Sequence, residues 1–322
     1  MHKYVFFEGI YGHSKYVFKD LEKENNCYFA DIPRHGIKGI LNHYHTSEKI
    51  NKKIKLPFKS IWYKGYLRKV IGGSDGYVFV FSEGCRQAYD YYFLSWLKNK
   101  YSNAKLVYYF LNSTCELSKK RLDYINNNFD IIVSYDKADC DKYNWNYYCG
   151  LYCADKEIKE NRTSDVFFVG RNKGRLKQII ESYELFSKAN MICDYNIVGV
   201  KKEDQKNSGI KYNKPLPYID VLKKDIGARF LFENLQENQT GCTFRTYEAI
   251  VYNKVLISNN LSLKEMRIFD KNRMFLYEKV EDISVDEIKK MEKLPQIITA
   301  KDLSPLLFLD FLEEKVDEDE KQ

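Results

Sequence analysis

Short, mostly apolar runs recur along this chain, and most of them are followed by a polar loop and then by a stretch with helical periodicity. Such runs are typical of strands that are buried on both faces of a sheet. Strands that alternate with helices predict parallel sheets with right-handed crossover connections. The predicted strands are Tyr4–Phe7, Cys27–Asp31, Tyr77–Ser82, Lys105–Phe110, Ile131–Ser134, Val166–Val169, Asp194–Gly199, Phe230–Phe232, Val255–Ser258 and Met274–Tyr277.

The length of the chain predicts two domains. A chain of 322 residues exceeds the size at which one hydrophobic core usually keeps growing. The most polar internal segment, residues 155–164, marks the boundary between them. We therefore predict a Rossmann-like N-terminal domain over residues 1–154, a second Rossmann-like domain over 155–312, and a disordered acidic tail over 313–322.

The charge distribution favours an anionic partner. The formal net charge is +7, although residues 313–322 hold six acidic residues and two lysines. The remaining body is therefore more basic than the total, which suits a nucleotide sugar, a phosphorylated lipid carrier, an acidic membrane surface or a nucleic acid. Zinc-finger and RNP-type signatures are absent from the sequence, so we expect no nucleic-acid partner.

The cysteines and the apolar segments indicate the compartment. Eight cysteines are scattered without a Cys-x-x-Cys pair, which favours reduced thiols over disulfides or structural zinc. The N-terminal segment lacks the pattern of a signal peptide, and no apolar run reaches the length of a membrane span. We therefore expect a cytoplasmic protein.

The segment from Arg229 to Asn260 carries the clearest functional pattern. It predicts a strand, a polar loop containing Gly241, a helix over 243–251 and a second strand. The N-terminus of a helix attracts anions, and glycine lets the backbone approach them closely. Arg245 on the first turn could give a bidentate fork to phosphate oxygens, and Glu248 could accept hydrogen bonds from a ribose diol. Together they suit a nucleotide diphosphate. The alternative is an ordinary surface pair between Arg245 and Glu248.

A second candidate phosphate site follows the buried strand at residue 166. The loop Gly170–Arg175 holds two glycines and three cations, Arg171, Lys173 and Arg175, which could neutralise a diphosphate. The spacing of a P-loop is absent. A solvated basic turn is the alternative interpretation.

Three stretches in a fixed order resemble a known family. Residues 239–260, with the sequence Q-T-G-C-T-F-R-T-Y-E-A-I-V-Y-N-K-V-L-I-S-N-N, are similar to the donor-site segment of bacterial GT-B-fold glycosyltransferases of surface polysaccharide synthesis, as in capsule and lipopolysaccharide O-antigen clusters. Residues 129–139 and 165–175 agree with the same resemblance. The resemblance covers about residues 130–260, and the first third of the chain is less distinctive.

The resemblance implies an α/β fold of GT-B type, in which two Rossmann-like domains face each other across a cleft and the last helix, from about Pro305, crosses back to the first domain. It implies a nucleotide diphosphate sugar as co-substrate without a further cofactor, a glycan or lipid-linked glycan as acceptor, and it allows peripheral contact with the inner face of the cell membrane. The expected donor-binding residues are Gly170, Arg171, Lys173, Arg175, Gln239, Thr240, Gly241, Thr243, Arg245, Thr246 and Glu248.

The stereochemistry and the catalytic base are read from single positions. Many retaining families of this fold have two glutamates separated by seven residues, the second matching Glu248, but the first would fall on Thr240. This departure favours inversion, which needs a general base on the acceptor hydroxyl. His13 is the first candidate and Glu83 the alternative, while Arg245 would stabilise the leaving diphosphate.

We expect no metal at the reaction centre. Asp139-Cys140-Asp141 has the letters of a metal-binding D-x-D triad, but it falls at a predicted helix start, where the helix dipole favours acidic residues. Cationic side chains near the diphosphate would take the place of a metal.

Two other functions stay open on the sequence. An opening strand followed by Gly9-x-x-Gly12 and Asp31 also suits a nucleotide-binding oxidoreductase, although G-x-G-x-x-G is absent. A noncatalytic α/β binding module of a polysaccharide assembly complex would need no turnover of a donor.

Overall fold

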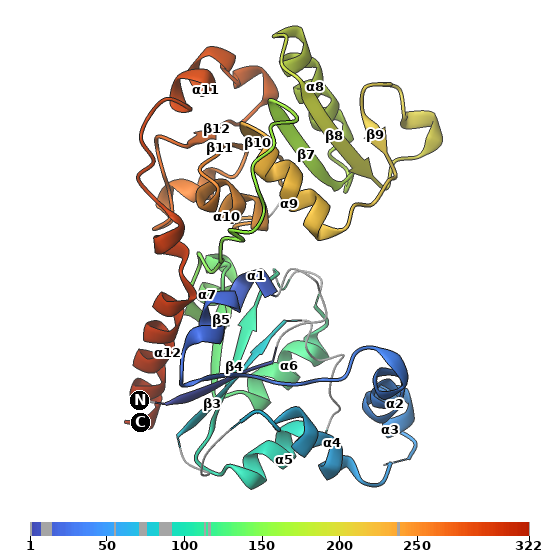
Figure 1. Ribbon diagram of the computed structural model, residues 1–322, viewed down its shortest axis with the longest axis vertical. Coiled ribbons are helices and arrows are strands. Elements are labelled where there is room, and N and C mark those ends of the chain that lie inside the picture. The colour runs from blue at the N-terminus through green and yellow to red at the C-terminus, as the bar shows by residue number, and fades with distance from the viewer. Residues whose placement is uncertain are drawn as a thin grey trace. The chain divides into compact units, whose positions relative to one another are not determined.

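The computed structural model describes residues 2–7, 15–54, 56–70, 76–83, 92–112, 114, 117–236 and 239–321. The chain forms two compact units, one made of Met1–Cys149 together with Pro305–Gln322 and the other of Gly150–Ser304. Each unit contains one six-stranded sheet in which every neighbouring pair is parallel (Figure 1). The division falls near the boundary that the sequence predicts.

The sheet of the first unit has the strand order β2-β1-β3-β4-β5-β6. Its central strands are almost wholly apolar because helices cover both faces, and the aromatic rings of Phe7 and Phe81 stack at 4.4 Å between centroids. The short strand β6 was not predicted, since its two residues are only half-buried. The strands are β1 Lys3–Phe7, β2 Cys27–Phe29, β3 Tyr77–Ser82, β4 Lys105–Phe110, β5 Ile131–Ser134 and β6 Asn146–Tyr147.

The helices of the first unit include three short ones in residues 33–70, where the sequence pattern is weak. Helix α7 begins as predicted, with Asp136 accepting from the Ala138 amide and Asp139 in the first turn. The helices are α1 Lys15–Phe18, α2 Gly36–Thr46, α3 Glu48–Asn51, α4 Lys59–Tyr66, α5 Phe93–Lys100, α6 Lys119–Asn128, α7 Lys137–Tyr143 and α12 Pro305–Glu320, with a 3-10 helix at Lys19–Lys23.

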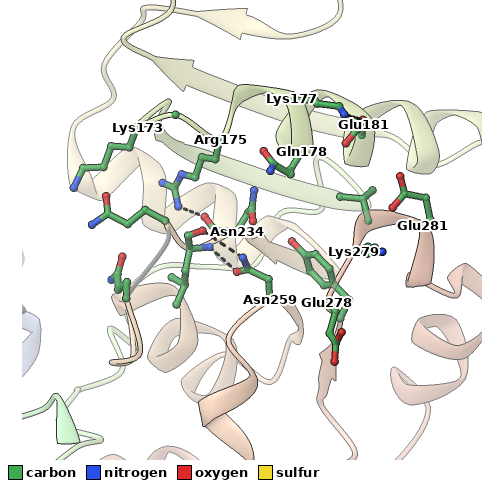
Figure 2. A pocket seen from close by; sticks show the side chains of 16 residues that line it. Lys173, Arg175, Lys177, Gln178, Glu181, Asn234, Asn259, Glu278, Lys279 and Glu281 are labelled. Carbon is green, nitrogen blue, oxygen red and sulfur yellow. Dashed lines mark hydrogen bonds and ion pairs between the residues drawn. The ribbon is translucent and has the colours of Figure 1, made fainter. Parts of the chain in front are cut away.

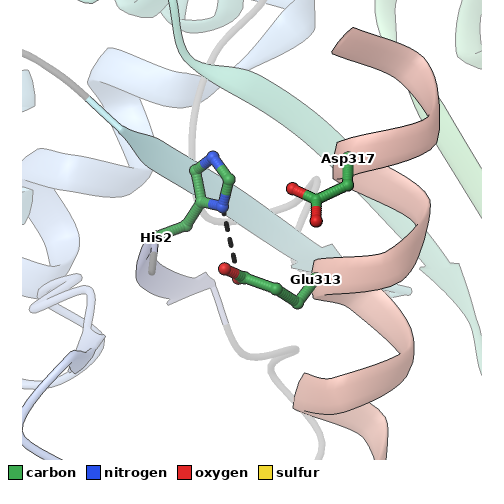
Figure 3. Close-up of side chains that lie close together, drawn as sticks. All are labelled: His2, Glu313 and Asp317. Carbon is green, nitrogen blue, oxygen red and sulfur yellow. Dashed lines mark ion pairs between the residues drawn. The ribbon is translucent and has the colours of Figure 1, made fainter. Parts of the chain in front are cut away.

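The structure corrects the predicted acidic tail. Residues 313–320 continue helix α12, because Phe308, Leu312 and Val316 are buried at helical spacing and extend the apolar face into the acidic segment. The side chain of Tyr4 donates a hydrogen bond to Glu313, and His2 Nδ1 lies 3.2 Å from the same carboxylate, with Asp317 beside them (Figure 3). The last helix therefore belongs to the first unit, as the GT-B resemblance implies.

Replacing Tyr4 by phenylalanine is expected to lower the free energy of unfolding of the first unit by about 1.5 kcal/mol. The change removes a hydrogen bond to a carboxylate, and the estimate stays at the low end of the usual range because Glu313 keeps access to water. Urea unfolding followed by tryptophan fluorescence measures it, since Trp62, Trp96 and Trp145 all lie in the first unit.

The matched control is Tyr28→Phe on β2, where the hydroxyl has no hydrogen-bond partner among the described residues. Equal unfolding curves for wild type and Tyr4→Phe would show that the contact does not hold α12 in place.

The sheet of the second unit has the order β12-β11-β10-β7-β8-β9. Strands β7 and β10 are neighbours although β8 and β9 lie between them in the chain. The connections after β7 therefore run toward one edge of the sheet, and those after β10 run toward the other edge. Ligands of such sheets bind at the carboxyl ends of the strands beside that switch point. The strands are β7 Val166–Arg171, β8 Cys193–Val198, β9 Lys211–Tyr212, β10 Phe230–Glu233, β11 Val255–Ser258 and β12 Met274–Leu276.

Helices on both faces of this sheet complete its core. Helix α8 buries Ile179, Ser182 and Phe186 at helical spacing, and Phe186 and Phe232 share one apolar cluster. The helices are α8 Leu176–Lys188, α9 Tyr218–Gly227, α10 Phe244–Val251 and α11 Val285–Met291, with 3-10 helices at Lys202–Asp204, Leu261–Glu265, Val280–Asp282 and Ala300–Leu303. Among the residues described, every helix is too short or too polar to cross a lipid bilayer.

Candidate functional site

A cavity of about 780 Å³ opens at the carboxyl ends of the strands in the second unit. Its wall comes from the β7–α8 segment (residues 173–175, 177, 178 and 181), from residues 234–236 and 239 after β10, from 259 after β11, and from 277–281 after β12. Figure 2 shows these side chains gathered around one opening. The cavity therefore lies at the edge of the sheet where the switch point places a ligand.

The β7–α8 turn presents positive charge to the cavity. Lys173 and Gly174 both have positive φ values, 43° and 81°, which turn the chain sharply before α8 begins. Helix α8 has no side-chain hydrogen bond at its N-cap and no acidic residue in its first turn, where Lys177 stands. Its first amides and its dipole are thus available to an anion.

Arg175 joins the ends of the two central strands. Its guanidinium donates to the carbonyl oxygen of Asn234 (Figure 2). It also donates to that of Arg171, at 3.2 and 3.3 Å. Burial, together with the nearby charge of Arg245, lowers the pKa of Arg175. Gly170 leaves room for this side chain, because a Cβ atom there would lie 3.4 Å from Arg175 Nη2 and 3.1 Å from Phe168. The side chain of Arg171 is exposed.

Amide side chains shape the opposite wall. Asn259 accepts from the Leu235 amide at 2.6 Å and so fixes the chain after β10. Asn234 is buried, and its Nδ2 has no hydrogen-bond partner among the described residues, although it borders the cavity. A buried donor without a partner is costly, so a ligand acceptor would satisfy it. Gln239, a predicted donor residue, also lines the cavity.

The structure corrects the predicted placement of Arg245. Its side chain is 12% exposed, and its two Nη atoms donate to the carbonyl oxygens of Val169 at 2.9 Å and Phe232 at 3.2 Å. The β7–β10 ladder pairs only Val166 and Phe167 of β7, so the diverging strands leave these carbonyls for the guanidinium. The Arg245 guanidinium, which we predicted to bind phosphate oxygens, therefore bridges the two central strands.

Two of the three predicted threonines face a buried carboxylate that was not predicted. The hydroxyls of Thr243, Thr246 and Ser258 all donate to Glu233, which is 2% exposed at the end of β10. Thr243 also caps α10 by accepting from the Arg245 amide. The sequence pattern that could have identified Glu233 is an acidic residue directly after an apolar run.

The carbonyls of Thr240 and Gly241 are held by a side chain that follows β11. Asn260 Nδ2 donates to them at 3.1 and 3.4 Å and so fixes the loop before α10 through its backbone. Gly241 is buried and Thr240 half-buried.

Glu248 is enclosed rather than facing a diol. It is 2% exposed and accepts from Tyr218 Oη at 2.5 Å, and Tyr218 in turn meets Tyr152 Oη at 2.7 Å. Asp225, fully buried on α9, lies beside it, and burial raises the pKa of both carboxyls. The charge of Arg245 opposes this rise at each of them. Helix periodicity alone does not reveal this enclosure, because Tyr218 and Asp225 come from α9.

The buried acid pair predicts a pH dependence for the second unit. In the unfolded chain an aspartate ionises near its ordinary pKa of 3.8, whereas burial keeps folded Asp225 protonated to higher pH. Above that ordinary value the folded state binds more protons, so this group's contribution to stability falls as pH rises. Replacing Asp225 by asparagine should therefore stabilise the second unit at neutral pH relative to wild type, with the gain shrinking toward about pH 4.

Thermal unfolding of both proteins across this pH range measures the difference. Asp220→Asn on the same helix is the control, because that carboxylate is 45% exposed. A Tm difference that does not change with pH would argue against a protonated Asp225.

The two predicted bases belong to the first unit. His13 lies outside the described residues. Glu83 directly follows β3 and accepts from the Leu111 amide at 3.2 Å and from the Asn112 amide at 2.8 Å. Burial raises the pKa of Glu83, and the hydrogen bonds from Asn112 and Leu111 lower it in part. A raised carboxyl pKa suits a general base, although the role itself stays a prediction.

No protein-family model and no curated protein sequence matches the chain. Among solved structures it is similar to an alpha-glucosyltransferase in complex with UDP and a 13-mer DNA containing an HMU base, at 12% identity and a TM-score of 0.55, over 91% of this chain and 90% of that one. It is also similar to a putative UDP-N-acetylglucosamine 2-epimerase from Listeria monocytogenes, at 10% identity and a TM-score of 0.49, over 93% and 92%. The first likeness and the two parallel sheets show the predicted two-domain α/β fold of GT-B type.

Proposed function

We propose that this protein is a glycosyltransferase that takes its sugar from a nucleotide diphosphate sugar bound in the cavity of the second unit. The observation that carries the proposal is the meeting of Lys173, Lys177 and the open N-terminus of α8 at a cavity beside the switch point. Its volume of about 780 Å³ suits a ligand of nucleotide-sugar size. The GT-B type of fold supports the same reading.

The diphosphate would lie against the first turn of α8. There the two lysines and the helix dipole would stabilise the charge that grows on the leaving group as the sugar–phosphate bond breaks. Arg175 would hold the turn in place through the carbonyls of Arg171 and Asn234. These cations are the reason to propose transfer without a metal ion.

The nucleoside would occupy the wall formed after β10 and β12. Asn234 and Gln239 offer amide groups that can pair with a base or with sugar hydroxyls. Glu278 and Glu281 supply exposed carboxylates that can accept from a ribose diol, the role that the sequence suggested for Glu248.

For the acceptor we propose a glycan or lipid-linked glycan of surface polysaccharide synthesis, with inversion at the transferred carbon and either His13 or Glu83 as the base. The support is the sequence resemblance and the departure at Thr240. Nucleic acid is not part of the proposal, although the alpha-glucosyltransferase of similar fold was solved with DNA.

A panel of nucleotide sugars tests the proposal. Thermal shift would identify a bound donor, and the mass of the product after incubation with acceptor oligosaccharides would identify transfer. Oxidation of a nicotinamide cofactor in place of transfer would support the oxidoreductase alternative. Binding of a donor without hydrolysis or transfer would support the noncatalytic module.

A further inference from the structure

Helix α2 turns its apolar side away from the unit that carries it. It rests on Gly39, where a Cβ atom would lie 2.5 Å from the Arg34 backbone, and on buried Asn42, whose Oδ1 accepts from Tyr66 Oη at 2.5 Å. Ile37, Ile40, Leu41 and Tyr44 are 78, 60, 48 and 55% exposed. At about 100° per residue these four cover an arc of about 100°, centred opposite Gly39 and Asn42.

The elements after α2 expose further large apolar side chains. Ile54, Phe58 and Ile61 are 66, 71 and 64% exposed. Phe58 also has a φ of 60°, a left-handed conformation that is uncommon for a bulky residue. This is more exposed apolar surface than scattered single residues would provide.

Helices α2, α3 and α4 form one substructure. Asn51 Nδ2 and Lys59 Nζ both donate to the carbonyl oxygen of His45, at 2.8 and 2.9 Å. The ring of Trp62 lies 5.2 Å from that of His45. Figure 1 shows α2 and α3 on the opposite side of the first unit from α12.

Positive charge accompanies the apolar residues. Between Arg34 and Lys69 the sequence contains ten lysines and arginines and one acidic residue, Glu48. This stretch therefore carries a larger positive charge than the whole chain, whose net charge is +7. Lys38, Lys52 and Lys53 are among its exposed cations.

We propose that the α2–α4 substructure binds the surface of an anionic lipid bilayer. An exposed apolar face beside lysines is the arrangement by which interfacial helices enter the boundary between headgroups and acyl chains. The side chains of Ile37, Ile40, Leu41 and Tyr44 would enter the boundary, while the lysines would meet lipid phosphates. A nucleic acid would use the cations but not the aliphatic face, because such interfaces are polar. The inference goes beyond the proposed function, since vesicle binding requires neither donor nor turnover.

Flotation of the full chain with lipid vesicles tests the proposal. Vesicles of phosphatidylcholine alone are compared with vesicles that also contain phosphatidylglycerol. We expect binding to the anionic vesicles only, weakened by salt, and a fall in bound protein of about tenfold or more for Ile40→Ser/Leu41→Ser and for Lys52→Glu/Lys53→Glu. Ile192→Ser, at a position that is 65% exposed in the second unit, is the matched control and should bind like wild type.

Three outcomes would overturn the proposal. The first is failure of the wild type to bind anionic vesicles, or equal binding by Ile40→Ser/Leu41→Ser with circular dichroism unchanged. The second is a wild-type protein that does not bind vesicles but forms a dimer in light scattering, while Ile40→Ser/Leu41→Ser is a monomer. That result would assign the face to a second copy of the chain. The third is a wild-type protein that does not bind vesicles but binds duplex DNA, with only Lys52→Glu/Lys53→Glu abolishing the DNA binding.

Discussion

Replacing Arg245 by alanine is expected to destabilise the second unit by about 2–6 kcal/mol, because each of two buried carbonyl oxygens left without its donor costs about 1–3 kcal/mol. The change removes the two donors that serve the Val169 and Phe232 carbonyls between the diverging central strands. It also removes the cation whose Nε lies 3.9 Å from buried Asp225. Hydrogen exchange of the β7 and β10 amides would measure the loss where it occurs, and thermal unfolding would measure it for the unit.

Arg245→Lys should recover only part of the stability, because one ammonium group cannot reproduce the planar fork between two carbonyls. Arg171→Ala is the control, since that side chain is exposed at the end of β7. If Arg245→Ala unfolds like wild type yet loses turnover at saturating donor, the residue acts on the leaving group, as the sequence analysis predicted, and its bridging role is minor.

The double substitution Lys173→Ala/Lys177→Ala is expected to reduce turnover by about a hundred- to a thousand-fold, the usual effect of removing a preorganised group that stabilises developing charge. Both side chains border the cavity beside the first turn of α8, and both are exposed, so the fold should be unaffected. Turnover at saturating donor is the measurement, because the charge grows only as the bond breaks.

Lys188→Ala at the other end of the same helix is the control for a general change of charge. Turnover close to wild type in the double variant would place the donor elsewhere. Loss of wild-type activity in a chelator, restored by magnesium or manganese, would instead give the leaving-group role to a metal ion.

The strands of both sheets could be predicted because parallel strands are buried on both faces. A run such as Val166–Val169 or Phe230–Phe232 must be continuously apolar to fit between two layers of helices, so it is visible in the sequence without a partner. The two-residue strands β6 and β9 could not be found this way, since edge strands need only a few backbone hydrogen bonds.

The candidate site was predicted in part. The cations of the β7–α8 turn were visible because they follow a buried strand, and Lys173, Arg175 and Gln239 do line the cavity. Glu278, Lys279 and Glu281 were missed, although they follow a predicted strand in the same way. Only the fold brings them to the β7–α8 turn, more than a hundred positions earlier in the chain.

The sequence by itself determined which residues share a face of an element, and the tertiary structure decided what that face meets. Arg245 and Glu248 lie on one helix both in the sequence prediction and in the structure. However, the divergence of β7 from β10 and the position of α9 turn the guanidinium to two carbonyls and the carboxyl to Tyr218 and Asp225. In α2 the same helical period that normally marks a buried face marks an exposed one, because Gly39 and Asn42 take the inner contacts, with the Arg34 backbone and with Tyr66. Periodicity is a local property of the chain, whereas the partner of each face comes from segments distant in sequence.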